Sequence, residues 1–132
     1  MSKTKVLEKL QFNPTQYTTD ERIAFAKKGK FLNQLVNDKF WGVRWEVAKH
    51  GHGLDILVND LDSLVRATVA SHSYGLDILI NDEDKYVRCE VARQGYGLDI
   101  LIDDEYFLIR EVVRMLKRKQ QSGNGSACRS TG

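Results

Sequence analysis

The chain has 132 residues, of which 42% are hydrophobic, and its formal net charge is +2. This length suits one domain with a buried core, and so small a net charge does not by itself indicate a nucleic-acid or membrane partner. No apolar stretch approaches the roughly 20 residues needed to span a bilayer, and the N-terminus lacks the apolar core of a signal peptide, so we expect a soluble, cytoplasmic protein.

The charges are distributed unevenly along the chain. Residues 31–113 hold 15 acidic and 8 basic side chains, whereas the segments before and after them are net basic. A long groove for a nucleic-acid backbone would need the opposite pattern. The two cysteines, Cys89 and Cys128, have no metal or redox spacing, which is typical of a reducing compartment. No metal site and no cofactor are predicted.

Two helices are predicted at the start of the chain. Residues 3–12 have the apolar spacing of a short amphipathic helix. A second helix should begin at a Thr18 or Thr19 cap and end at Gly29. Its arginine, alanine and final glycine align at a spacing of 22 residues with those of the next segment, so we interpret residues 1–30 as an N-terminal cap with a degenerate repeat.

One phrase then recurs at a spacing of 22 residues, starting at Gly51, Ser73 and Gly95. Self-similarity at a fixed period indicates a stacked-repeat architecture. Each copy holds Leu-Asp-Ile-Leu, predicted as a short helix or 3₁₀ turn, and then a longer helix with a broad apolar stripe. The short run could also form a strand, but its aspartate alternates poorly for a buried strand. The predicted fold is an all-α, right-handed solenoid of about four to five repeats, with regular repeats at 31–52, 53–74, 75–96 and 97–119.

The last repeat is predicted to end differently. Lys117 occupies the position at which Gly51 and Gly95 end the earlier long helices, so the last helix should run on. Residues 1–119 would then form a single domain. The polar residues 120–132 are interpreted as a flexible tail or a remnant of an expression vector.

Aspartate and arginine recur at fixed places in the repeats. An aspartate ends each short helix, and an arginine follows six residues later. The guanidinium fork suits carboxylates on adjacent units, so the two series predict a structural ladder that ties one repeat to the next. Its predicted members are Asp38, Arg44, Asp60, Arg66, Asp82, Arg88, Asp104 and Arg110.

The aspartate, the Val-Arg pair that follows it (Val65-Arg66, for example) and the next apolar pair resemble the HEAT-type α-solenoid repeat. The repeat length and the Val-Arg…Val-Ala phrase are even more similar to the leucine-rich repeat variant, which alternates an α-helix with a 3₁₀ helix. The resemblance covers about residues 15–118 and implies an architecture without an activity. Some members of that family carry an iron–sulfur cluster on a cysteine-rich segment that this chain lacks, so no cofactor is implied.

Aromatic residues interrupt the repeat at Phe40, Trp41 and Trp45. The two tryptophans are four residues apart and share one helix face, whereas the next two repeats have small or polar residues at these positions. Tryptophan and tyrosine are enriched in binding hot spots. The group could fill a gap beside the irregular first repeat or form a partner-binding patch. A second aromatic pair, Tyr106 and Phe107, lies in the last repeat.

Three histidines are clustered in the sequence. His50 and His72 are one repeat apart, with His52 nearby, and imidazole is a common zinc ligand. The next two repeats have Gln94 and Leu116 at this position, however, so no metal site is predicted. His50 and His72 are assigned instead to the tentative partner-binding surface.

The favoured function is a non-catalytic protein–protein interaction module with an unidentified protein partner. No Ser/His/Asp order or phosphate-binding loop is present, so no enzymatic activity is predicted. The chain also resembles HEAT-like DNA glycosylases in one respect, because Trp41, Trp45, Arg44 and Asp38 could be grouped like the cleft residues of those enzymes. The other alternative is a nucleic-acid-binding HEAT-like protein that uses basic residues near both ends: Lys27, Lys28, Lys30, Arg114, Lys117, Arg118 and Lys119.

Overall fold

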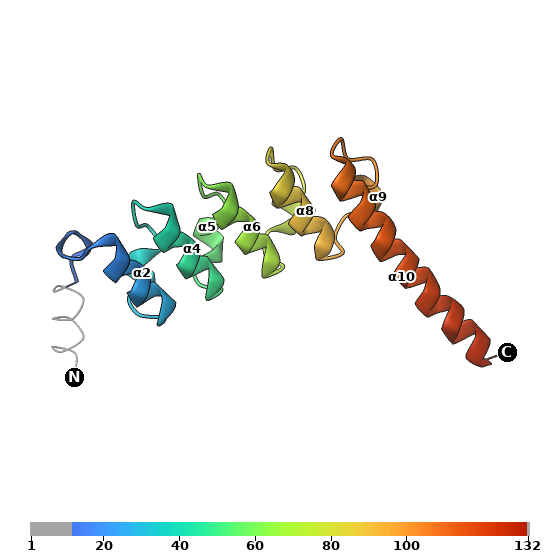
Figure 1. The fold of residues 1–132 in the computed structure, drawn as a ribbon, viewed down its shortest axis with the longest axis horizontal. Coiled ribbons are helices and arrows are strands. Elements are labelled where there is room, and N and C mark those ends of the chain that lie inside the picture. The colour runs from blue at the N-terminus through green and yellow to red at the C-terminus, as the bar shows by residue number, and fades with distance from the viewer. Residues whose placement is uncertain (1–11, 132) are drawn as a thin grey trace. The chain divides into compact units, whose positions relative to one another are not determined.

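The computed structural model describes the backbone of residues 12–131 and the side chains of residues 12–122. Within this part of the chain every regular element is helical and no strand occurs (Figure 1), which confirms the all-α prediction and the choice of helix for Leu-Asp-Ile-Leu. The predicted helix at residues 3–12 lies outside the described residues, apart from its last residue. None of the described helices is long and apolar enough to cross a membrane.

The chain divides into two compact units, Met1–Val69 (unit 1) and Ala70–Gly132 (unit 2). In unit 1, α2 packs against α4, and the short helices α3 and α5 both contact α4. The elements of unit 1 are η1 (Pro14–Gln16), α2 (Thr19–Lys27), α3 (Leu32–Leu35), α4 (Trp41–Lys49), α5 (Leu54–Leu57) and α6 (Ser63–Ser71), whose last two residues belong to unit 2.

Unit 2 has the same alternation of short and long helices. Its long helix α8 packs against α10, and the short helices α7 and α9 contact α8 and α10, respectively. The elements of unit 2 are α7 (Leu76–Leu79), α8 (Lys85–Arg93), α9 (Leu98–Leu101) and α10 (Phe107–Thr131).

The apolar stripe of each long helix forms the core of its unit. In unit 1, Val43 and Val47 of α4 are completely buried, as is Leu35 of the short helix α3. Burial of one such side chain is worth about 1.5–3 kcal/mol, so these positions are the main driving force for folding. The matching core of unit 2 consists of Leu79, Val87, Val91, Ala92, Leu101, Ile109 and Val113.

A glycine in the left-handed region precedes three of the short helices. Gly53, Gly75 and Gly97 have φ of 65°, 64° and 64°. A β-carbon on Gly53 would lie 2.5 Å from Cγ2 of Val36, and one on Gly97 would lie 2.2 Å from Cδ1 of Ile80. Glycine is therefore needed for its φ and because the preceding short helix packs directly against the backbone.

Phe31 takes the same left-handed conformation before α3, with φ of 59°. This conformation costs an L-residue about 1–2 kcal/mol. The Phe31 ring lies 4.4 Å from the Phe12 ring and 5.3 Å from the Phe25 ring between centroids, and Tyr17 meets Phe25 edge-on at 4.9 Å. Aromatic pairs contribute about 0.5–1.5 kcal/mol each beyond burial, so this N-terminal aromatic cluster offsets the strain.

Helix α10 is longer than the sequence predicted. The domain was expected to end at residue 119 with a flexible tail from 120, but the backbone remains helical through Thr131. The earlier stops at Gly51 and Gly95 use a left-handed residue, with φ of 69° and 78°. Lys117 replaces that residue and no proline follows, so nothing interrupts the run of backbone hydrogen bonds.

Candidate functional site

Unit 1 contains two arginine–aspartate pairs. Arg22 of α2 donates from Nε to Asp38 Oδ2 over 2.8 Å and from Nη2 to Oδ1 over 3.3 Å. Arg44 of α4 makes the same fork with Asp60 over 2.7 and 3.1 Å. Only 4% of the Arg22 side chain and 2% of the Asp38 side chain are exposed. The first pair is therefore a buried, bidentate ion pair.

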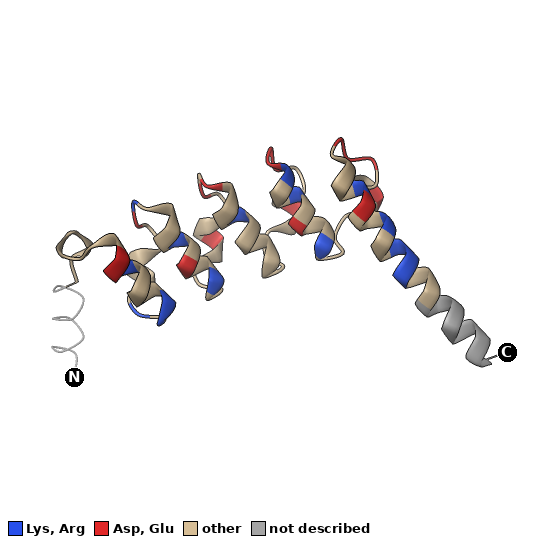
Figure 2. Ribbon diagram, in the orientation of Figure 1, with Lys and Arg blue, Asp and Glu red and all other residues tan. Residues whose placement is uncertain are grey.

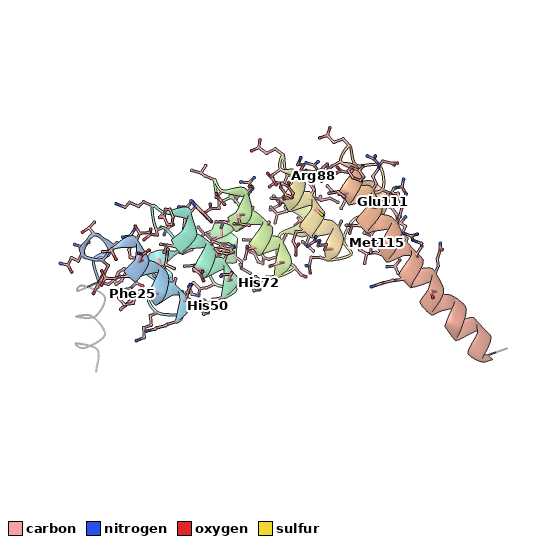
Figure 3. All side chains as sticks on the ribbon, viewed as in Figure 1. Phe25, His50, His72, Arg88, Glu111 and Met115 are labelled. Carbon is pink, nitrogen blue, oxygen red and sulfur yellow. The ribbon has the colours of Figure 1, made fainter. Side chains whose placement is uncertain are left out.

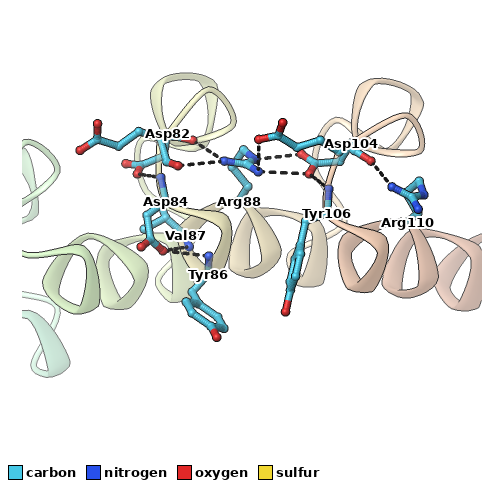
Figure 4. A network of polar contacts seen from close by, with 10 residues as sticks. Asp82, Asp84, Tyr86, Val87, Arg88, Asp104, Tyr106 and Arg110 are labelled. Carbon is cyan, nitrogen blue, oxygen red and sulfur yellow. Dashed lines mark hydrogen bonds and ion pairs between the residues drawn. The ribbon is translucent and has the colours of Figure 1, made fainter.

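Unit 2 contains an equivalent pair (Figure 4). Arg88 donates from Nε to Asp104 Oδ2 over 2.8 Å and from Nη2 to Oδ1 over 3.2 Å. The carboxylate of Asp104 also accepts the Tyr106 backbone N–H over 2.9 Å. The remaining nitrogen of Arg88, Nη1, donates to the Asp82 carbonyl over 2.8 Å. Each arginine thus joins the loop before its own helix to the carboxylate of the following loop.

In each of the three pairs the carboxylate binds an arginine sixteen residues earlier, on the preceding long helix. At the six-residue spacing, Nη1 of Arg44 donates to the backbone carbonyl of Asp38 over 2.7 Å. The Asp38 carboxylate binds Arg22, sixteen residues earlier, because it also accepts the Phe40 N–H over 2.9 Å in a turn that directs it toward the preceding long helix. Arg22 is therefore a ladder member that the predicted set omitted, although it aligns with Arg44 at the 22-residue spacing.

Hydrogen bonding favours the charged forms of three ladder residues, Arg44, Arg88 and Asp104. The bond to Asp60 raises the pKa of the Arg44 guanidinium, and the bond to Asp104 does the same for Arg88. Burial pushes the pKa of Asp104 upward, but the hydrogen bonds from Arg88 and the Tyr106 amide outweigh it and leave that pKa below its ordinary value. A carboxylate held in this way does not exchange protons near neutral pH, so the ladder is suited to structure rather than to acid–base chemistry.

The aromatic group of unit 1 is partly exposed. Phe40 and Trp41 are 36% and 39% exposed, and their ring centroids are 5.7 Å apart. Trp45 lies 6.2 Å from Trp41 but is held in place, because its Nε1 donates to Thr68 Oγ1 over 2.9 Å and Lys49 Nζ lies 4.0 Å from its ring centroid. The structure thus brings the three predicted aromatic residues together and leaves Phe40 and Trp41 as the outward part.

The predicted histidines lie at the C-terminal ends of long helices, in different units (Figure 3). His50 follows α4, at the end remote from the aromatic group, and its Nε2 lies 3.0 Å from the Lys27 carbonyl oxygen at the end of α2. In unit 2 the equivalent Gln94 accepts from Ser73 Oγ over 2.9 Å. His50 therefore serves a contact between neighbouring helix ends, whereas His72 is exposed in unit 2.

A second aromatic group lies in unit 2. Tyr86, which is 63% exposed, meets Tyr106 at 6.4 Å between ring centroids, and Tyr106 meets Phe107 at 6.0 Å. Lys85 Nζ lies 4.5 Å from the Tyr106 centroid and 5.6 Å from that of Tyr86. The sequence pattern did not single out Tyr86 and Lys85, although Lys85 lies 22 residues, or one repeat, before Phe107 of the predicted pair.

The basic residues of the nucleic-acid alternative lie at the end of α2 and along α10 (Figure 2), and some of them are paired within their own unit. On α10, Lys117 Nζ donates to Asp99 Oδ1 over 2.9 Å, which lowers the pKa of that carboxyl. Arg114 pairs with Glu111 one turn earlier on the same helix. The remaining basic residues of this set are exposed, namely Lys27, Lys28, Lys30, Arg118 and Lys119.

The Asp and Arg of the glycosylase-like grouping both belong to the ladder. The Asp38 carboxylate is bound by Arg22, and the Arg44 fork is bound by Asp60. Within the described residues, no buried side-chain nitrogen or oxygen lacks a hydrogen-bond partner. In the same part of the chain, no group of three or more His, Cys, Asp or Glu side chains is arranged to hold a metal ion.

Comparison with known proteins adds no assignment: no family model, curated protein or solved structure matches the chain. The candidate functional surface therefore rests on the geometry of the chain itself. It comprises the outward aromatic residues Phe40 and Trp41 of unit 1, while the buried polar groups around them are engaged in the ladder.

Proposed function

We propose that the chain is a non-catalytic protein-binding module, built as a right-handed α-solenoid of the HEAT-like or leucine-rich repeat variant type. The proposal is supported by the recurrence, in each unit, of a short and a long helix, a left-handed residue before the short helix and an arginine fork on the next aspartate. Repeats of this kind cannot bury their apolar faces alone and do so against their neighbours.

The exposed pair Phe40 and Trp41 carries the functional part of the proposal. In the next two repeats the position of Phe40 is taken by Asp62 and Asp84, whose carboxylates accept backbone N–H groups at the start of α6 and α8. Phe40 makes no such cap at the start of α4. Loss of a helix cap costs about 0.5–2 kcal/mol. A site that gives up a cap to expose two aromatic rings is better explained by recognition than by stability.

The test replaces both residues by those of the neighbouring repeat. The double variant Phe40→Asp/Trp41→Ser should restore the cap and remain at least as stable as the parent in thermal melts. In quantitative affinity capture from the native host, we expect it to lose a partner that the parent retains, with Tyr86→Ala in unit 2 as the matched control. Full retention of every partner by the double variant would contradict this surface.

The parent chain and the same double variant also distinguish protein binding from charge-driven nucleic-acid binding. A mobility-shift assay at low and high salt should show no salt-dependent complex of the parent with duplex DNA. A complex that survives Phe40→Asp/Trp41→Ser but is lost when Lys27, Lys28 and Lys30 are changed to Gln would replace the protein-binding proposal.

A further inference from the structure

One face of α10 departs from the repeat at three positions. Where α8 has Glu90, Arg93 and Gln94, α10 has Val112, Met115 and Leu116, each 22 residues later. Glu90 interacts with both of the others, since Gln94 Nε2 donates to Glu90 Oε1 over 3.3 Å and Arg93 Nη1 lies 3.8 Å from Glu90 Oε2. A polar cluster on one helix has thus become an apolar surface on the next.

The three apolar residues of α10 line a groove beside α8. The groove has a volume of about 370 Å³, and Arg93 of α8 and Lys119 of α10 complete its lining. Met115 is 53% exposed, although burial of a methionine side chain would lower the free energy of the fold. Methionine is also the side chain that adapts best to varied apolar partners. The groove therefore has the composition of a helix-binding site in which a partner covers the apolar floor.

The charges near the groove favour an acidic partner. Glu111, the acid nearest to Val112 on α10, pairs with Arg114. Arg118 and Lys119 follow at the far end of the apolar stretch, and both are exposed. Arg93 is paired with Glu90, so the excess positive charge near the floor comes from Arg118 and Lys119. This excess attracts carboxylates and repels basic segments.

We propose that this groove binds an amphipathic acidic helix of another protein, whose apolar side chains cover Met115 and Leu116 while its carboxylates meet Arg93 and Lys119. The proposal goes beyond the interaction assigned to Phe40 and Trp41, because it uses a separate surface in unit 2. It also specifies the chemistry of the partner: a helix with apolar residues at positions i, i+3, i+4 and i+7 and with Asp or Glu flanking that stripe.

The test uses the full chain and a designed probe. The probe is a fluorescein-labelled, acetylated and amidated peptide of about 15 residues, long enough to form a helix, with a leucine stripe and glutamates on its other faces. Two matched peptides replace either every glutamate by lysine or every leucine by serine. In fluorescence anisotropy we expect the Leu/Glu probe to bind about tenfold or more tightly than either. Equal binding of the lysine peptide would overturn the proposal.

Variants that restore the residues of α8 test the groove itself. Met115→Arg and Leu116→Gln place on α10 the side chains that the fold already accommodates at the same positions of α8, so both should keep the melting temperature of the parent within a few degrees. Each should weaken binding of the Leu/Glu probe about tenfold. Leu108→Tyr is the matched control, because it replaces an exposed residue of α10 outside the groove by its α8 equivalent, Tyr86, and should leave the affinity unchanged. Unchanged affinity in Met115→Arg would overturn the proposal.

Two other occupants give distinct results. A dimer seen by light scattering that Met115→Arg abolishes would assign the groove to a second copy of the chain and overturn the acidic helix. Sedimentation with phosphatidylserine vesicles that Met115→Arg abolishes, without binding of the Leu/Glu probe, would assign it to a membrane surface and also overturn the proposal. The variant Phe40→Asp/Trp41→Ser should bind the probe like the parent, so this proposal and the proposed function fail separately.

Discussion

Units 1 and 2 share the same ladder but differ at their outer elements. The two hydrogen bonds from Arg44 to Asp60 are 2.7 and 3.1 Å long, and those from Arg88 to Asp104 are 2.8 and 3.2 Å long. Unit 1 adds a more deeply buried pair and a cluster of four aromatic rings around its first helix. Unit 2 instead has the long helix α10, whose apolar face lines an open groove.

This difference separates two kinds of residue. The positions that recur in both units hold the helices together, and their side chains are largely buried. The positions that differ lie near the first and last of the described helices. In unit 1 the aromatic rings there pack against one another. In unit 2 Met115 stays exposed, which is why the groove beside it is a candidate for a partner.

Removal of the first arginine should have the largest effect. Arg22→Ala leaves the buried Asp38 carboxylate without its partner, which typically costs about 3–5 kcal/mol. Arg88→Ala, at a more exposed pair, should cost about 1–3 kcal/mol. Urea unfolding followed by circular dichroism measures both variants, and tryptophan fluorescence reports unit 1 alone because Trp41 and Trp45 both lie there.

A compensating double variant checks that the missing charge partner causes this loss. Arg22→Met/Asp38→Leu removes both charges, so it should recover most of the stability that Arg22→Ala loses. Equal losses for Arg22→Ala and Arg88→Ala would contradict the role given to burial.

The second prediction concerns the glycines that begin the short helices. Gly53→Ala combines a strained φ with a contact of 2.5 Å to the stiff, β-branched Val36, so it should cost about 3 kcal/mol. Gly95→Ala is the matched control, because its φ is also positive but no atom lies within 4 Å of the added β-carbon. It should cost only about 1 kcal/mol. Similar losses in the two variants would mean that φ alone, and not close packing, requires glycine.

The sequence was sufficient to predict features that recur. A 22-residue period, a glycine before each short apolar run and a stripe of valines together specify helices and their buried faces. The ladder residues were also visible as regular series. The partner of each carboxylate was not, because an aspartate has arginines both six residues after it and sixteen residues before it, and only the turn made by its own side chain decides between them.

Features that occur once were harder to predict. The left-handed Phe31 contradicts the preference of its residue type and is explained only by the rings that surround it. The hydrogen bond from Trp45 to Thr68 links residues on different helices, so no local sequence pattern predicts it. The change of three polar positions to Val112, Met115 and Leu116 is visible in the sequence, but the groove also needs Arg93 of the neighbouring α8 in its lining.

The pH dependence of stability should distinguish the ionised Arg88–Asp104 pair of unit 2 from a variant in which Asp104 is replaced by the uncharged asparagine. The pKa of Asp104 is lowered in the folded chain, so this carboxylate stabilises the fold above its unfolded pKa of about 3.9, and the contribution is lost as pH falls through the folded value. Asp104→Asn should cost about 1–3 kcal/mol at neutral pH. The difference in stability between parent and variant should shrink as the pH is lowered from about 5 toward 2 in thermal melts. A difference that does not change with pH would contradict an ionised fork.

The smallest expected effect concerns Ser73, which takes the left-handed conformation that Gly95 takes one repeat later, with φ of 57° against 78°. Ser73→Gly removes a strain of about 1–2 kcal/mol but also removes the exposed hydrogen bond from Ser73 Oγ to Gln94, worth about 0.5 kcal/mol or more. The net result should be a gain of about 0.5 kcal/mol, or a few degrees in melting temperature. Ser73→Ala loses the same hydroxyl and keeps the strain, so it should be less stable than the parent. The difference between the glycine and alanine variants then measures the backbone strain, less the extra freedom of glycine in the unfolded chain. An alanine variant as stable as the glycine variant would contradict a strained turn.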